Sequence, residues 1–137
     1  MKRILTFGIA VLMLCAMVVP VYAAGGVTPY YNNTIRVSGR FQIDANGQAV
    51  ITLSFTGYTN YATGATFESK IQKSTSSGWV DVSGASWVDV IEGTRGTLQH
   101  TYQLTSKGTY RLVSEIEVRG TGGSPDVIYE TVEDVYS

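Results

Sequence analysis

The chain has 137 residues, of which 44% are hydrophobic and 15% are charged, and its formal net charge is −1. This length fits a single domain with an ordinary core. A mildly acidic protein does not attract nucleic-acid phosphates or anionic lipid, so the composition argues against both as partners.

Residues 1–23 have the pattern of a secretory signal peptide. Lys2 and Arg3 are followed by an apolar run over 4–19, and Val21-Tyr22-Ala23 places small or medium residues at a signal-peptidase site. We expect cleavage after Ala23, because the run is shorter than the about 20 residues that an uncleaved membrane anchor needs. The sequence therefore predicts a secreted protein, or a periplasmic one if the envelope has an outer membrane, with no membrane insertion after cleavage.

Cys15, the one cysteine, lies inside the apolar run and follows Leu14, which is too large for a lipidation site. The expected mature chain has 114 residues, a net charge of −3 and no thiol. It can have no disulfide, no cysteine nucleophile and no metal bound by cysteine, although it is exported. Its stability must therefore come from its core.

Residues 24–33 contain glycine and proline without periodicity, and we expect a flexible lead-in to one domain over residues 34–137. From Ile35 onward apolar and polar residues alternate, as in a half-buried strand with Ile35 on its core face. Asn46-Gly47 favours a hairpin turn, so the first strand and the apolar alternation over 49–55 form a predicted hairpin.

Six further strands follow with the same alternation. Residues 57–64 and 120–125 are predicted loops, and residues 86–91 are an expected short edge strand that also offers a route to self-association. The other predicted strands are 65–72, 79–82, 97–104, 110–118 and 127–136. Seven or eight short strands without a helical period predict an all-β, two-sheet antiparallel sandwich, and a small barrel is the alternative.

The segment Ser106-Lys107-Gly108-Thr109-Tyr110 resembles the Asp-x-Gly-x-Tyr corner of immunoglobulin-like and fibronectin-type-III-like sandwiches, with serine in the aspartate position. The resemblance implies that the Tyr110 ring packs inward and that its hydroxyl bonds to the backbone a few residues upstream. Gly108 suits a backbone with positive φ, and Ser106 can cap the turn. The layout also resembles small secreted bacterial β-sandwich proteins of the kind grouped as domains of unknown function.

The sequence contains no catalytic constellation. Glu115 and Glu117 share one strand face, as paired catalytic carboxylates can, but Arg111 and Arg119 flank them and favour a solvated face of mixed charge. His100, the single histidine, falls on the apolar phase of its strand, and no Gly-x-Ser-x-Gly elbow accompanies it. We therefore interpret His100 as a part-buried structural residue and predict a protein that is not an enzyme and has no cofactor.

The sequence also predicts no metal site. One histidine and no mature cysteine argue against zinc and copper. Asp44 and Asn46 offer oxygen ligands for calcium, but an Asn-Gly turn explains both residues without an ion. Glu130, Glu133 and Asp134 are interpreted as a solvated acidic face.

Aromatic residues in loops and turns are the candidate binding residues. Exposed tyrosine and tryptophan supply contact area at low entropic cost, and loops at one end of a sandwich are a common binding surface. Flat rings also stack on sugars, although the two tryptophans fit a role in capping the core better than a role in binding. The candidates are Tyr30, Tyr31, Tyr58, Tyr61, Trp79 and Trp87.

We expect an exported binding domain that recognises a protein at or outside the cell surface. This hypothesis predicts an exposed aromatic loop cluster or an unprotected sheet edge. The alternative, a carbohydrate-binding module, requires two coplanar rings a few ångströms apart with Asn or Asp beside them. A small hydrolase, the third hypothesis, requires His100 in a cleft next to a serine or a carboxylate.

Overall fold

The computed structural model describes residues 30–137, and within this range no residue lies in a helix. No described segment is therefore a helix that could span a membrane. The predicted signal peptide, Cys15 and most of the lead-in lie outside the described residues. Seven strands form, namely β1 (Thr34–Ile43), β2 (Gln48–Gly57), β3 (Ala62–Thr75), β4 (Gly78–Glu92), β5 (Arg95–Gln103), β6 (Gly108–Gly120) and β7 (Asp126–Tyr136).

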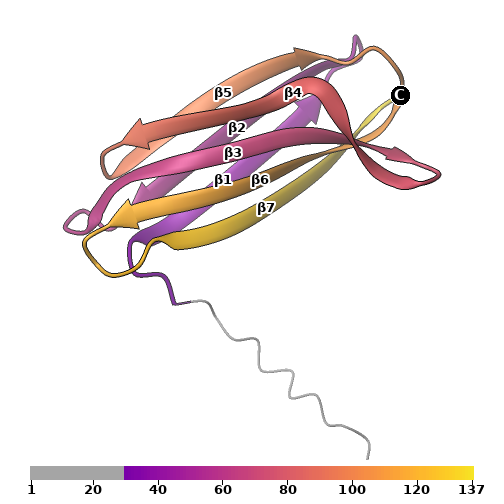
Figure 1. The fold of residues 1–137 in the computed structure, drawn as a ribbon. Coiled ribbons are helices and arrows are strands. Elements are labelled where there is room, and N and C mark those ends of the chain that lie inside the picture. Colours follow the sequence, from indigo (N-terminus) through magenta and orange to yellow (C-terminus); the bar gives the residue numbers. More distant parts are fainter. Residues whose placement is uncertain (1–29) are drawn as a thin grey trace, which may run out of the picture.

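The strands form two antiparallel sheets, one with the order β1-β2-β5 and one with the order β4-β3-β6-β7 (Figure 1). This arrangement confirms the predicted two-sheet sandwich, and the sheets do not close into a barrel. The fourth strand pairs with the third. In constant-type immunoglobulin domains it instead joins the sheet of the first, second and fifth strands.

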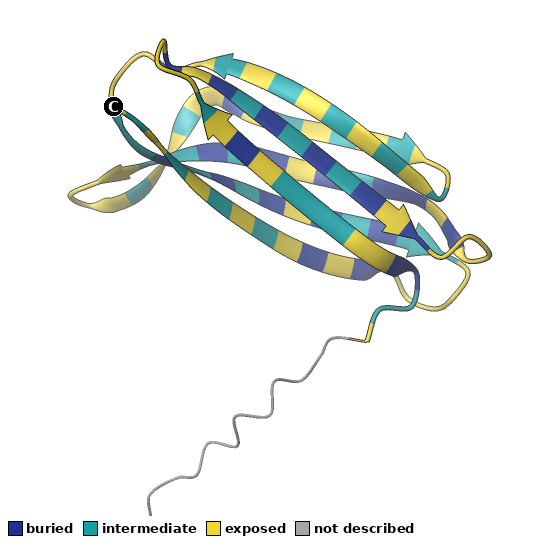
Figure 2. Cartoon of the chain, turned by 180° about the vertical axis from the view of Figure 1, so that it is seen from behind, coloured by how far each residue is buried: buried dark blue, intermediate teal, exposed yellow. Residues whose placement is uncertain are grey.

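The core lies between the two sheets. More buried and more exposed residues alternate along the strands (Figure 2), because successive side chains of a strand point to opposite faces. Phe55 of β2 and Phe67 of β3 meet across the sheets, with ring centroids 6.1 Å apart. Burying each large apolar side chain contributes about 1.5–3 kcal/mol. The apolar residues with no exposed surface are Ala49, Ile51, Leu53, Ala65, Phe67, Ile71, Ala85, Leu112, Ile116 and Val118.

One strand, β4, replaces the two strands predicted over 79–82 and 86–91. The β3 ladder pairs Lys70 with Ser86 but Gln72 with Asp81, so several β4 residues bulge opposite one residue of β3. Within the bulge Gly84 takes φ +78°, which glycine adopts without strain. A bulge bends a strand without ending it. On the side of the bulge towards the β3–β4 turn, residues 72–75 of β3 and 78–81 of β4 form a twisted hairpin, seen at the right of Figure 1. We call this hairpin the arm.

The start of β1 differs from the prediction at two residues. Ile35 is 56% exposed and does not face the core, because the register with β2 shifts beside it and turns Thr34 inward. Asn33, assigned to the flexible lead-in, is fully buried. The cause is Asp126 of β7, whose carboxylate accepts the backbone N–H groups of Asn32 and Asn33 and the Thr34 hydroxyl at 2.7–2.8 Å.

Tyr110 lies as its corner motif predicts. Its ring is buried, and its hydroxyl donates to the carbonyl oxygen of Ser106 at 2.6 Å. Gly108 has φ +148°, and Lys73 covers the corner by donating to the Ser106 hydroxyl at 2.7 Å. The corner fixes the path of the chain from β5 into β6, which is one of the two central strands of its sheet and carries Glu115.

Candidate functional site

The outer face of the four-stranded sheet carries a row of acidic and apolar side chains. Val88, Glu68, Glu115 and Tyr129 lie directly opposite one another on β4, β3, β6 and β7. Their chain neighbours, such as Phe67, face the core, so these four side chains point outward. We call these four residues the outer row.

A depression of about 400 Å³ lies over the outer row. Val88 and Tyr129 stand on its two sides, and each is 71% exposed. The two glutamates lie between them on the central strands. The depression is lined by Glu68, Ser69, Lys70, Ser86, Trp87, Val88, Val113, Glu115 and Tyr129. Its surface therefore combines apolar sides with two glutamates, and Lys70 adds one cation.

The three central carboxylates of this face, Glu68, Glu115 and Glu117, have no ion-pair partner among residues 30–137. The described chain forms three ion pairs, and none of them includes Glu68, Glu115 or Glu117. Glu68 and Glu115 are directly opposite each other, an arrangement of like charges that destabilises a sheet. The centre of the outer face therefore carries carboxylates that no ion pair of the described chain neutralises.

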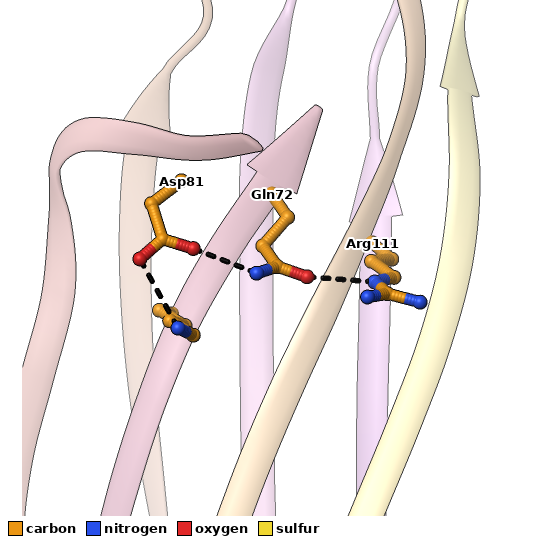
Figure 3. Close-up of polar contacts among 4 residues, drawn as sticks. Gln72, Asp81 and Arg111 are labelled. Carbon is orange, nitrogen blue, oxygen red and sulfur yellow. Dashed lines mark hydrogen bonds and ion pairs between the residues drawn. The ribbon is translucent and has the colours of Figure 1, made fainter. Parts of the chain in front are cut away.

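Two of the cations on this face are held by a hydrogen-bonded network at the base of the arm (Figure 3). The Lys70 ammonium lies 3.1 Å from the Asp81 carboxylate. Gln72 donates to Asp81 at 2.6 Å and accepts from Arg111 at 2.8 Å. The hydrogen bond from Gln72 has the largest effect on the pKa of Asp81, which it lowers, and the hydrogen bond from Lys70 lowers this pKa further. Lys70 and Arg111 are thus engaged away from the two glutamates.

The third cation, Arg119, lies at the other end of β6 and donates to the Thr66 hydroxyl and to Glu92. The predicted face of mixed charge is therefore divided, with cations at its two ends and carboxylates in the middle. Alternation along the chain indicates that Glu68 and Glu115 point outward. Their pairing follows only from the β3–β6 ladder, which sequence reasoning did not provide.

The β4 side of this face is an open sheet edge, because β4 pairs only with β3. The Gly93 N–H donates to the Thr63 carbonyl at 2.8 Å, so these two residues form a hydrogen-bonded pair that continues the β3–β4 register. Hydrogen-bonded and non-hydrogen-bonded pairs alternate in an antiparallel ladder. Ser86, Val88 and Val90 therefore belong to non-hydrogen-bonded pairs, and they direct their N–H and C=O groups away from β3. β4 contains no proline or lysine, and the edge-protecting features it does have are the bulge at Gly84 and the inward-facing Asp89.

His100 and Asp89 join the two sheets on the inner side of this edge. The His100 Nε2 lies 2.7 Å from the Asp89 carboxylate, and the Trp87 ring stacks on the imidazole at a centroid distance of 4.9 Å. A carboxylate therefore lies beside His100, as the hydrolase hypothesis requires. Within the described chain, however, no serine or threonine hydroxyl is hydrogen-bonded to His100. The contacts bridge β4 and β5 and match the structural interpretation.

The six candidate aromatic residues do not form one cluster. Tyr58 and Tyr61 are exposed in the loop between β2 and β3, at the end of the sandwich where the chain enters. Their ring centroids lie 6.4 Å apart, but the rings are nearly perpendicular, at 77°. The pair therefore lacks the coplanar platform that the carbohydrate hypothesis requires.

The other four aromatic candidates have separate surroundings. Trp79 lies on the arm, where the Arg111 guanidinium is 4.3 Å from its ring centroid. Trp87 is stacked on His100. Tyr30 is almost fully exposed, whereas Tyr31 packs partly against the core. Both tryptophans thus have internal contacts, and Trp87 also lines the depression. Tyr129, which the sequence analysis did not select, is the more exposed ring there.

The described residues contain no group of three or more His, Cys, Asp or Glu side chains placed to hold a metal ion. At the turn considered for calcium, Asp44 accepts the backbone N–H groups of Asn46 and Gln48 at 2.8 and 2.9 Å. These are the bonds of a turn in which the aspartate stabilises the backbone.

Sequence comparison adds no relative, since no protein-family model and no curated protein matches this chain. The function is therefore argued from the surface itself.

Proposed function

We propose that this protein is an exported, non-catalytic domain that binds another protein through the outer face of its four-stranded sheet. The observation that carries the proposal is the outer row, in which exposed Val88 and Tyr129 flank Glu68 and Glu115 across one depression. Exposed apolar groups favour being covered by a partner, and the charges between them select which partner fits.

The energetics of the outer row support this use. Two glutamates directly opposite on neighbouring strands cost the isolated protein roughly 0.2–1 kcal/mol. Apolar surface at Val88 and Tyr129 gains about 25 cal/mol for each Å² that a partner covers. A partner that supplies both a cation and an apolar group removes the repulsion and buries the two sides of the depression at once.

The setting of the proposal is outside the cytoplasm, at or beyond the cell surface. Residues 1–23 support export through their signal-peptide pattern, and the expected mature chain needs no disulfide. The corner at Ser106–Tyr110 and the single-domain layout support a place among small secreted bacterial sandwich proteins with an immunoglobulin-like or fibronectin-type-III-like fold.

The proposal is tested by capturing partners from the surface of the producing cell with residues 24–137. We expect wild type to retain a discrete protein that the double variant Val88→Ser, Tyr129→Ser no longer retains. The matched control is Tyr58→Ala, Tyr61→Ala, which removes two exposed rings elsewhere and should retain that protein. Capture that depends on the Tyr58 and Tyr61 pair, and not on the outer row, contradicts the proposal.

A further inference from the structure

We infer that the partner supplies an extended, basic segment that pairs with the open edge of β4 as an added strand. This inference rests on the proposed function and names the mode of binding and the chemistry of the partner. It follows from the position of the outer row, because Glu68 lies on β3, one strand inside the unpaired edge of β4.

The backbone of β4 provides the first half of the recognition. Ser86, Val88 and Val90 direct their N–H and C=O groups away from β3, and no other described strand pairs with them. An extended peptide satisfies such groups by continuing the sheet, and the pockets beside the edge then select its alternate side chains.

The outer face provides the second half. Strands are spaced by about 4.8 Å, so an added strand lies about 10 Å from β3. A lysine or arginine on the added strand beside Val88 can lay its aliphatic stem over that exposed side chain and bring its charge to Glu68. The charged head thus meets a carboxylate that has no cationic partner in the described chain.

The same face defines a sequence pattern for the partner. Glu92 lies four residues beyond Val88 on the same side of β4, and its carboxylate is 77% exposed although Arg119 lies 3.4 Å away, so its open side favours a second basic residue. Between them Val90, which is also exposed, favours an apolar residue. In the segment that fits, the residues at every second position face the outer row, and these are alternately basic and apolar.

Charge complementarity favours this partner over a second copy of the chain. β4 contains Asp81, Asp89 and Glu92 but no lysine or arginine. Pairing two copies of β4 gathers only acidic charged side chains at the shared edge and brings no cation to Glu68. A basic strand meets the same edge with opposite charge.

The probe for this inference is the peptide KTVTKTVTK, acetylated, amidated and fluorescently labelled, added to residues 24–137. Fluorescence anisotropy should show binding that weakens between about 50 and about 300 mM salt, because the charges are partly exposed. One control peptide has N-methyl groups on alternate residues, which removes the N–H donors, and should bind at least about tenfold more weakly. The other, ETVTETVTE, should not bind.

Variants at Val88 test the edge, and a variant at Glu68 tests the face. Val88→Pro removes an N–H that points to the open edge and leaves the ladder with β3 intact, and proline is tolerated on such edges. We expect it to weaken peptide binding at least about tenfold. Val88→Thr keeps the N–H and the branched shape, so it should retain most of the affinity. Glu68→Gln should weaken binding and reduce its dependence on salt.

Each contrary result has a distinct meaning. If Glu68→Gln weakens binding while Val88→Pro and the N-methylated peptide bind like their parents, the face binds without strand addition and this inference is wrong. If wild type captures a protein partner through the outer row but does not bind KTVTKTVTK, the basic chemistry is wrong and the proposed function stands. A dimer in sedimentation that Val88→Pro dissociates would show a second copy at this edge. If Val88→Pro does not fold, the N-methylated peptide decides the test.

Discussion

Two regions of this molecule use carboxylates in opposite ways. Where the chain enters the sandwich, Asp126 is only 5% exposed and accepts three hydrogen bonds from the segment before β1. On the outer sheet face, Glu68 and Glu115 are exposed, opposite each other and without a cation among the described residues. A carboxylate satisfied inside the chain holds the fold together. One that is left unsatisfied at some cost in stability is available to another molecule.

The region around Asp126 shows how completely such a site is filled when its role is structural. The Asn33 amide donates to the Ser124 carbonyl at 3.1 Å and accepts the Gly122 N–H at 3.0 Å. A side chain on Gly120 would place its Cβ 2.3 Å from the Asn33 amide oxygen, so only glycine fits there. No polar side-chain atom buried in the described part of the chain lacks a hydrogen-bond partner.

The comparison predicts its largest effect for Asp126→Ala. This change leaves two backbone N–H groups and the Thr34 hydroxyl without their acceptor, and each unpaired buried donor costs about 1–3 kcal/mol. We expect the free energy of unfolding to fall by about 3 kcal/mol or more, measured by urea denaturation. Asp126→Asn, which keeps one acceptor oxygen, should lose less. A loss below about 1 kcal/mol for the alanine variant would show that the Asp126 carboxylate does not hold the fold together.

Asp89 is the intermediate case, because it is partly buried and has one partner, His100, across the two sheets. We expect Asp89→Ala and His100→Ala to be non-additive, with a coupling free energy of about 1 kcal/mol in a double-mutant cycle of unfolding. Additive single and double variants would mean that the contact does not help hold β4 to β5. In that case the contact would not fix the position of β4, the strand next to Glu68 of the outer row.

Much of this picture was accessible from sequence, since period-two alternation located the strands and the Ser106–Tyr110 pattern located the corner. The continuity of β4 could not be predicted from the sequence, because a bulge at Gly84 has the same composition as a loop. Asn33 looked like lead-in because its partner Asp126 lies 93 residues away. The outer row was missed for the same reason, since opposition of Glu68 and Glu115 depends on which strands pair.

A smaller effect of opposite sign is expected for Glu68→Gln. Removing one of two opposed charges should raise the free energy of unfolding by roughly 0.2–1 kcal/mol in the absence of a partner. The matched control is Glu133→Gln, because Glu133 lies opposite Arg111 in the ladder and its removal should give no gain. The measurement is the urea midpoint of each variant at low salt. If Glu68→Gln is destabilising, Glu68 and Glu115 do not repel each other, and the contrast between the outer face and the Asp126 site fails.

The smallest effect concerns Asp81, an exposed carboxylate whose pKa is lowered from the usual 3.8 by Gln72 and then by Lys70. A group with a depressed folded pKa stabilises the protein above its unfolded pKa and loses that contribution as the pH falls through the folded value. Wild type should therefore lose a small part of its stability below about pH 4 that Asp81→Asn does not lose. Urea midpoints of both proteins at neutral pH and in acid measure the difference.

The same variant links the arm to the outer row. In wild type Asp81 holds Lys70, which lies two residues along β3 from Glu68 and points to the same face. Asp81→Asn removes that anion, so Lys70 is free to turn towards Glu68 and neutralise it. We expect KTVTKTVTK to bind more weakly to this variant at neutral pH, although its fold is unchanged. Equal affinity would show that Lys70 does not control the charge of the outer row, which then owes its negative charge to the two glutamates alone.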